Sequence, residues 1–183
     1  MKTLEPLEIG PLILRAFRED DAQEVQTLAG DFEVADTTAR IPHPYEDGLA
    51  EAWIEGQAKE REEGREVVFA IEEVASNRLV GAIGLVLGPQ AHSAEVGYWI
   101  GKPFWNQGYA TLALKGVLGF AFQTLGLERV YAHHMTRNAA SGRVMEKAGM
   151  SYEGLSPKHF ERWGKLEDIA FYGMLRESWR DDG

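Results

Sequence analysis

Cysteine is absent from the 183 residues of this sequence. Disulfide bonds, thiolate zinc sites and cysteine nucleophiles are therefore excluded, and a reducing cytoplasm is compatible with the chain. Long apolar runs are also absent, because no segment approaches the roughly 20 apolar residues that a membrane-spanning helix needs. Residues 1–8 contain no apolar stretch of the kind that a signal peptide carries. We therefore expect a cytoplasmic protein without a membrane partner.

Positive charge is scarce, since 19 lysines and arginines are set against 29 aspartates and glutamates, and the formal net charge is −10. This balance disfavours a polyanionic partner, so we expect no nucleic acid. It mildly favours a cationic acceptor, because a negative field raises the local concentration of amines. The alternative is that the acidic surface serves only solubility.

Histidine is also rare, and its placement does not indicate a metal site. The sequence holds five histidines and no H-E-x-x-H motif. His133 and His134 are adjacent on an expected strand, so their side chains point to opposite faces and cannot hold one ion together. We therefore predict that the protein binds no metal.

Apolar residues make up 44% of the chain and charged residues 26%, as is typical of a globular domain. No repeat, low-complexity tract or linker interrupts the pattern, so we expect one continuous domain over residues 1–183. The apolar spacing predicts helices at about 22–29, 46–63, 108–125 and 138–148. Strands are predicted at 8–17, 67–71, 79–85, 94–100, 129–135, 152–155 and 168–175. This order favours an α+β fold around one central sheet.

Local signals refine the first two helices. Asp20 and Asp21 each offer an N-cap for the first helix. The segment 31–44 is expected to be irregular, because its prolines cannot continue a helix. The second helix is expected to bury Trp53, Ile54 and Ala58.

The segment from Pro103 to Ala110 joins the 94–100 strand to a helix that starts near Gly108. The first turn of a helix has unpaired N–H groups and the positive end of the helix dipole, so it can bind an anion such as a diphosphate. Gly108 and Ala110 are small and let phosphate oxygens approach the backbone. The segment matches neither G-x-x-x-x-G-K-[ST] nor G-x-G-x-x-G, which argues against an ordinary nucleotide-binding domain. A connection that binds no ligand is the alternative.

Three motifs resemble those of a known family, the GNAT N-acetyltransferases. The acetyl-CoA signature of that family is similar to Glu95-x-Gly97-Tyr98-Trp99-Ile100-Gly101 followed by Trp105-x-x-Gly108-Tyr109-Ala110-Thr111. Its second cofactor motif resembles Asn138-x-x-Ser141-x-Arg143-Val144-Met145-Glu146-Lys147-x-Gly149-Met150. The terminal strand of the branch that contains the ribosomal-protein-alanine N-acetyltransferases resembles residues 168–179. The resemblance covers essentially the whole chain. It implies a single-domain GNAT fold, with helices flanking a mixed and mostly antiparallel sheet, and acetyl-CoA as the co-substrate.

The resemblance also implies a set of cofactor-binding residues. Backbone amides from Tyr98 to Ile100 are expected to pair with the pantetheine arm as an added strand would, and to donate to the developing oxyanion. Asn138 either contacts that arm or caps a helix. Arg143 and Lys147 lie one helical turn apart and either meet the 3′-phosphate of the cofactor or are solvated charges. The implied set is Tyr98, Trp99, Ile100, Trp105, Asn106, Gln107, Gly108, Tyr109, Ala110, Thr111, Asn138, Ser141 and Arg143.

Two side chains are candidates for catalysis. An alkylammonium group has a pKa of roughly 10 and must lose a proton before it attacks a thioester. Glu95 resembles the frequent base position of the family and would accept that proton or orient a water; the alternative is a solvated strand carboxylate. Many relatives place a tyrosine four residues after the position of Ser141, where this chain has Met145, which cannot donate. Ser141 is therefore the candidate proton donor to the departing sulfur, unless it only completes the helix start.

The acceptor is expected, by analogy with the family, to lie against the segment 31–45 and the second helix. The candidates for contact there are Phe32, Arg40, His43, Tyr45 and Trp53, and each of them can equally serve packing. The implied acceptor is a primary amine, on a protein N-terminus or a small molecule. A non-catalytic acyl-CoA-binding sensor is the alternative function, and a homodimer is possible in either case.

Overall fold

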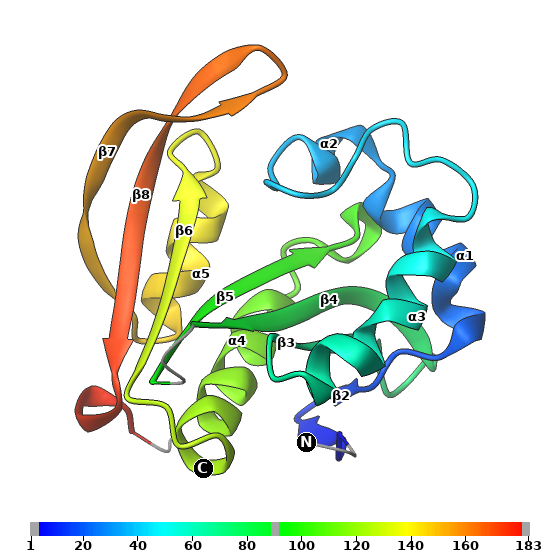
Figure 1. Ribbon diagram of the computed structural model, residues 1–183, viewed down its shortest axis with the longest axis horizontal. Helices are drawn as coiled ribbons and strands as arrows, with labels where there is room; N and C mark the ends of the chain where they lie inside the picture. The colour runs from blue at the N-terminus through cyan, green and yellow to red at the C-terminus, as the bar shows by residue number, and fades with distance from the viewer. Residues whose placement is uncertain (1–3, 89–91, 181–183) are drawn as a thin grey trace.

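The computed structural model of the chain describes residues 4–88 and 92–180. Eight strands form one sheet in the order β1-β2-β3-β4-β5-β6-β8-β7, in which β5 and β6 are parallel and the other neighbours antiparallel (Figure 1). This arrangement confirms the predicted α+β class with a mixed, mostly antiparallel sheet. The strands are β1 Leu7–Ile9, β2 Leu12–Arg15, β3 Glu66–Glu73, β4 Arg78–Leu87, β5 Ser93–Ile100, β6 Arg129–Met135, β7 Ser151–Arg162 and β8 Lys165–Leu175.

Helices cover both faces of the sheet (Figure 1). Alternate residues of β3 show this, because Phe69 packs in one apolar cluster with Leu114 of α4, whereas Ala70 packs in another with Val25 of α1 and Ile54 of α3. The helices are α1 Ala22–Ala29, α2 Phe32–Ala35, α3 Leu49–Glu62, α4 Tyr109–Gly119 and α5 Ala139–Lys147. Short 3₁₀ turns lie at η1 Glu19–Asp21, η2 Lys102–Phe104 and η4 Arg176–Ser178, and a π-helical turn, η3 Phe120–Thr124, extends α4.

The apolar spacing of α4 is confirmed by its burial. Leu114, Val117, Leu118 and Ala121 are all at most 1% exposed and form one face against the sheet. In the part of the chain that the structure describes, no helix combines the length and the apolar character that crossing a bilayer requires.

The expected strand at 8–17 is two strands. Pro11 has no N–H to donate, and Gly10 adopts a left-handed φ of 56°, so the chain turns there and β2 folds back on β1. The local apolar pattern was correct, but a two-residue turn reversed the direction of the chain inside it.

Asp21 occupies the predicted N-cap position of α1, but its side chain makes no capping hydrogen bond to that helix. Its carboxylate instead accepts from Arg15, with Nη1–Oδ2 at 2.7 Å and Nη2–Oδ1 at 2.8 Å. Arg15 Nε also donates to Glu72 of β3 at 2.6 Å. All three side chains are buried, at 7 to 8% exposure. This buried ion cluster joins β2, β3 and η1.

Two other local predictions need correction. The segment 31–44 contains the short helix α2, which Asp31 caps by accepting from the backbone N–H of Glu33 at 2.8 Å. On α3 the buried positions are Ala50, Ile54 and Gln57, so Ala58 falls outside that stripe and is exposed.

The last two strands are longer than predicted. They form a hairpin whose tip reaches over toward α2 (Figure 1). The pairing of β7 with β8 shifts between Tyr152 and Gly154 and again between Ser156 and Phe160. Such bulges break the regular alternation of side chains, and for this reason the sequence pattern beyond residue 155 did not indicate a strand.

Candidate active site

The parallel strands β5 and β6 separate beyond their first residues. The register pairs them only over Ser93–Glu95, whereas β5 pairs with β4 along Ala94–Ile100. From Val96 onward the β6-facing edge of β5 therefore has no partner in β6, and its backbone groups face a gap between the two strands (Figure 1). An unpaired edge of this kind can accept an extended ligand as an added strand.

A cleft of about 1090 Å³ occupies this region and extends from the start of α4 to the segment between α2 and α3. The sequence-predicted residues that line it are Glu95, Tyr98, Trp99, Ile100, Trp105, Asn106, Gly108, Tyr109, Ala110, Thr111, Asn138, Ser141, Arg143, Arg40, Tyr45, Trp53 and Lys147. Gln107, Phe32 and His43 are not among its lining residues. Tertiary structure thus brings most of the predicted site into one cleft.

The start of α4 presents free backbone donors to the cleft. Gly108 is the N-cap with a left-handed φ of 81°, which favours glycine, and no side chain in the described part of the chain caps this helix. The N–H of Leu112 bonds to the Gly108 carbonyl at 3.1 Å and opens the helical ladder. The N–H groups of the preceding turn, through Thr111, lie at the positive end of the helix dipole. This geometry suits an anion such as a diphosphate.

Three side chains of the same loop serve its structure. Trp105 Nε1 donates to the carbonyl of Ile100 at 2.6 Å and so ties the loop back to β5. Tyr109 sends its hydroxyl to Glu73 on β3, and Gln107 Nε2 donates weakly to the carbonyl of Pro103 at 3.4 Å. The groups of this loop that these three contacts leave available are therefore those of its backbone.

Tyr98 reaches from β5 to the first turn of α5. Its hydroxyl lies 2.9 Å from Ser141 Oγ and 3.2 Å from the Ser141 carbonyl oxygen. Burial raises the pKa of Tyr98 to about 12, against the opposing effect of the bond to Ser141. The phenol is therefore protonated at neutral pH and acts as a donor. Sequence reasoning gave Tyr98 only a backbone role, although strand alternation does place it on the face opposite to Glu95.

The first turn of α5 is capped as expected. Asn138 Oδ1 accepts from the backbone N–H of Ser141, with a long separation of 3.4 Å. This bond leaves the Ser141 hydroxyl available for other contacts. Met145 is 2% exposed and belongs to the core, whereas Arg143 and Lys147 are exposed along the cleft.

Glu95 lies on the opposite face of β5 and faces β6. Its Oε1 is 3.3 Å from Nδ1 of His133, and both side chains are about one third exposed, at 29% and 32%. His134 points the other way and is buried with Nδ1 2.9 Å from the Met135 carbonyl oxygen, so the predicted opposition of the two histidines is confirmed. Within residues 4–88 and 92–180 no cluster of three or more potential metal ligands occurs.

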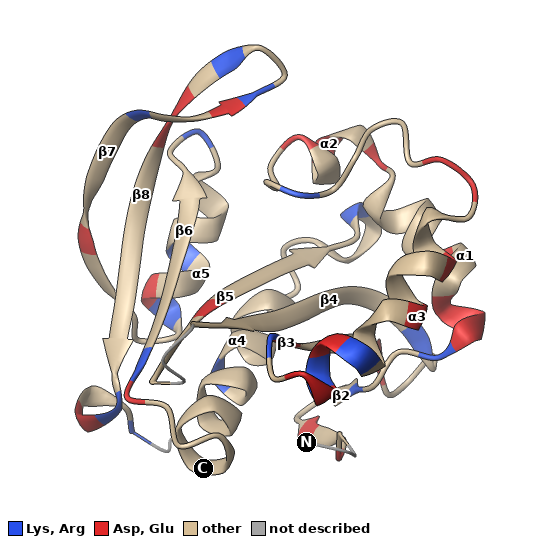
Figure 2. Ribbon diagram, viewed as in Figure 1, with Lys and Arg blue, Asp and Glu red and all other residues tan. Residues whose placement is uncertain are grey.

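The wall of the cleft opposite β6 is formed by aromatic residues. Trp53 packs edge-on against Phe17 with ring centroids 4.8 Å apart. Tyr45 also lines the cleft, and burial, followed by the charge of Glu51, raises its pKa. Figure 2 shows acidic positions at the start of α1 and in the loop before α3, and a mixture of acidic and basic positions on α3. Acidic positions of this kind attract cations.

Phe32 and His43 lie at the rim. The Phe32 ring is 51% exposed and contacts His43 edge-on at 5.1 Å, and it is 6.4 Å from the ring of Trp163 at the hairpin tip. The two rings therefore contact one another edge-on, Phe32 also lies beside the hairpin, and neither residue lines the cleft.

Three cations hold α2 and the segment that follows it at the mouth of the cleft. Lys102 of η2 pairs with Glu33. Arg137, which precedes α5, bonds Asp36 at 2.6 Å. Arg162 at the hairpin tip donates to three backbone carbonyl oxygens, those of Ala35 at 2.7 Å, Ala39 at 3.3 Å and Ile41 at 2.6 Å.

Known proteins match this chain along most of its length. A family model described as Acetyltransferase (GNAT) domain matches residues 11–151. The chain is 29% identical over 171 residues to an uncharacterized N-acetyltransferase, YoaA, of Bacillus subtilis (strain 168), with 93% of this chain and 96% of that protein covered.

Solved structures share the fold. A GNAT-family acetyltransferase from Bacillus anthracis has a TM-score of 0.84 at 25% identity, with 94% of this chain and 99% of that chain covered. RimL, a ribosomal L7/L12 alpha-N-protein acetyltransferase in complex with coenzyme A, has a TM-score of 0.82 at 17% identity, with 93% and 98% covered. At that identity the likeness to RimL concerns the fold alone.

Proposed function

The chain belongs to the GNAT acetyltransferase family and is an acetyl-CoA-dependent N-acetyltransferase, and from this premise we propose that it acetylates a primary amine by direct attack in a ternary complex. The observation that carries the proposal is the convergence of two backbone features on one cleft. These are the uncapped N-terminus of α4 and the unpaired edge of β5. The first fits the diphosphate of coenzyme A and the second fits its amide-bearing arm.

We propose that the Glu95 carboxylate accepts the proton that the acceptor ammonium group loses. Acetyl-CoA supplies the thioester carbonyl, and the amine nitrogen forms a bond to that carbonyl carbon while the carbon–sulfur bond breaks. The ammonium proton passes to the Glu95 carboxylate, directly or through water. His133 supports this role, because its Nδ1 lies 3.3 Å from Glu95 and orients the carboxylate at the cleft.

Ser141 is proposed to give the departing sulfur its proton. When the Tyr98 hydroxyl donates to Ser141 Oγ, 2.9 Å away, the serine proton can point into the cleft. After that proton has gone to the sulfur, the phenol can return a proton to Ser141 and regain its own from the solvent. Many relatives have a tyrosine at the position of Met145. In this proposal, Ser141 takes the role of that tyrosine as proton donor, and its hydroxyl contacts Tyr98 of β5.

Ser141→Ala is expected to lower kcat by about 100-fold, the low end of general-acid effects, because serine is a modest acid. The cap of α5 is expected to survive, since Asn138 accepts from the backbone N–H of residue 141 and not from its hydroxyl. Steady-state kinetics and thermal unfolding measured together separate the two roles. An unchanged kcat, or a loss of activity that follows a loss of stability, would mean that Ser141 only completes the first turn of α5 and is not the proton donor.

The acetylation itself is tested by thiol release from acetyl-CoA against a panel of peptides and small amines, with mass spectrometry of the products. Acetylated amines are expected. Tight binding of acetyl-CoA without thiol release across the panel would favour the non-catalytic acyl-CoA-binding sensor. Failure to bind coenzyme A at the amides that follow Gly108 would contradict both functions.

A putative ribosomal N-acetyltransferase of Bacillus subtilis (strain 168), YdaF, is 33% identical to this chain over 89 residues and supports the branch that contains the ribosomal-protein acetyltransferases. A cytoplasmic location and a homodimer stay predictions, and so does the absence of a metal.

A further inference from the structure

Arg40 lies at the acceptor end of the cleft with its donors nearly unused. Its Nη1 is 3.7 Å from Glu66 Oε1, beyond hydrogen-bond distance, and its side chain is 69% exposed. Among the residues that the structure describes, it donates no hydrogen bond to another protein group. A guanidinium carries five N–H donors in a planar fork that matches a carboxylate.

The neighbouring cations differ from Arg40 in this respect. Lys102 pairs with Glu33. Arg137 bonds both Asp36 and Glu167, at 2.6 and 2.9 Å. The guanidinium of Arg162, at the hairpin tip, is engaged by backbone carbonyl oxygens. Glu33, Asp36 and Glu167 thus each have a cationic partner. The guanidinium of Arg40, in contrast, has N–H groups that no described protein group accepts.

The backbone that carries Arg40 is held on both sides. Arg162 donates to the carbonyl oxygen of Ala39 at 3.3 Å and to that of Ile41 at 2.6 Å. Although Arg40 lies in an irregular segment, its backbone is therefore anchored at the cleft before any ligand arrives. Preorganisation of this kind lowers the entropy cost of binding.

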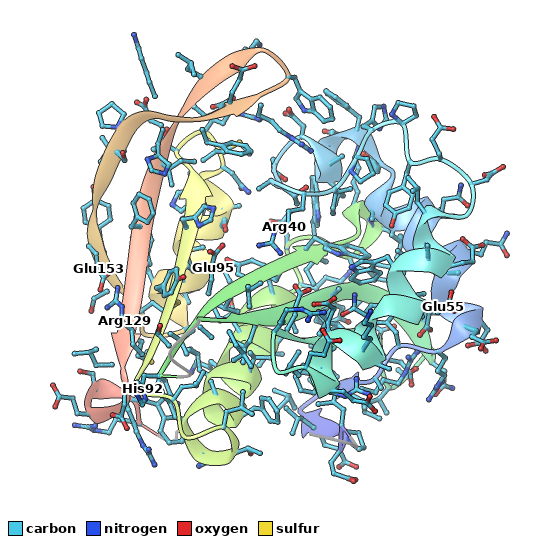
Figure 3. The ribbon with its side chains drawn as sticks, viewed as in Figure 1. Arg40, Glu55, His92, Glu95, Arg129 and Glu153 are labelled. Carbon is cyan, nitrogen blue, oxygen red and sulfur yellow. The ribbon has the colours of Figure 1, made fainter. Side chains whose placement is uncertain are left out.

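The sheet register sets the separation between Arg40 and the proposed base. Glu66 of β3 is opposite Val86 of β4, and Val86 is opposite Glu95 of β5, so the three side chains share one face. Two strand spacings separate Glu66 from Glu95, which is about 10 Å. Arg40 contacts Glu66 and, as Figure 3 shows, extends toward the cleft in which Glu95 also lies. A ligand held by both side chains therefore bridges the part of this separation, of about 10 Å, that the two side chains do not span themselves.

We propose that Arg40 binds the carboxylate of the acceptor, and that the acceptor is a small amino acid that carries its amine and its carboxylate on one molecule. The inference rests on the proposed function and deepens it by naming the acceptor class. The acceptor carboxylate would share Arg40 with Glu66. Arg137 shows that one guanidinium can serve two carboxylates in this protein.

The experiment compares α-, β- and γ-amino acids with their carboxamides as acceptors, for the wild type and for Arg40→Gln, Arg40→Lys and Arg176→Gln. Each acceptor is compared with itself between enzymes, so differences in amine reactivity cancel. Arg40→Gln is expected to lower kcat/KM for the amino acids by about 10- to 100-fold, the range for a lost hydrogen bond to a charged group, and to leave the carboxamides unchanged. Arg40→Lys should retain part of the preference, because lysine keeps the charge but not the fork.

Arg176→Gln is the matched control. Arg176 is also an exposed arginine in a loose contact, 3.5 Å from Glu128, and it does not line the cleft. Its substitution is expected to change neither series. An equal loss for amino acids and carboxamides in Arg40→Gln would overturn the inference, and so would a wild type that prefers carboxamides or accepts only peptides. If an outcome of this kind is found but thiol is still released with any of these amines, only the acceptor class is wrong and the proposed acetylation is retained. Thiol release with none of them would contradict the acetylation itself.

Discussion

Glu95→Gln is expected to lower kcat/KM for amine acetylation by about 100- to 10,000-fold, the usual range for the loss of a general base. Glutamine keeps the size of the side chain and can still contact His133, 3.3 Å from the present carboxylate, but it cannot accept a proton from an ammonium group. The affinity for coenzyme A should not change, because the proposed cofactor contacts come from the backbone of β5 and of α4. Steady-state kinetics and a coenzyme A titration together measure both quantities.

Glu55→Gln is the control for that experiment. Glu55 is an exposed glutamate on α3 and does not line the cleft (Figure 3). Its substitution removes the same charge from an already acidic protein and should leave turnover as it is. Wild-type kinetics in Glu95→Gln would remove Glu95 from the mechanism, and an equal loss in both variants would mean that net charge, and not a base, supports the rate.

Arg15→Ala is expected to lower the free energy of unfolding by about 3–5 kcal/mol, the usual cost of removing one partner from a buried ion pair. Arg15 bonds Asp21 twice and Glu72 once, and without it two buried carboxylates lose the cation that bonds them directly. For a chain of this length the loss corresponds to a fall in Tm of roughly 6–20 °C. Denaturant titration and a thermal scan measure the effect.

Arg18→Ala is the matched control, because Arg18 is 59% exposed and lies 3.5 Å from the same Glu72. Its loss should cost at most about 1 kcal/mol, as for other surface ion pairs. Similar costs in the two variants would contradict a dominant role for the buried ion cluster.

The cost of Arg15→Ala should also depend on pH. Burial by itself would raise the pKa of Asp21, but the hydrogen bonds from Arg15 and from the Arg18 backbone, together with the Arg15 charge, hold it below its ordinary value of 3.8. A carboxyl group whose pKa is lowered by folding stabilises the protein above its unfolded value, and this stabilisation is lost as the pH falls through the folded value. The difference between wild type and Arg15→Ala should therefore be full at neutral pH and shrink below about pH 4. A difference that is constant down to pH 2 would contradict this assignment.

Local sequence was sufficient for the elements whose signals are periodic. The apolar stripe of α4 from Leu114 to Ala121 and the buried run of β3 predicted their elements, because burial on one face imposes a fixed period on the sequence. Those signals failed where a turn or bulge interrupts the period, as at Gly10 and beyond residue 155. They also failed for the side chain of Asp21, which accepts hydrogen bonds from Arg15 and does not cap α1 with its carboxylate.

The candidate site divides in the same way. The anion-binding turn at Gly108 was visible in the sequence, because it depends on a few consecutive backbone groups. The contact of Tyr98 with Ser141 was not, since 43 residues separate them and only the packing of α5 beside β5 brings them together. The same holds for Arg40, whose distance from Glu95 depends on the register of three strands.

By itself, the sequence determined the family, the central sheet and the helix start that faces the cleft, because each depends on residues that are neighbours along the chain or on an unbroken period. Tertiary structure alone decided which side chains face one another across the gap between β5 and β6. The physical reason is that ion pairs and hydrogen bonds act over a few ångströms, and whether two distant residues come that close depends on strand register and helix packing, which no local pattern encodes.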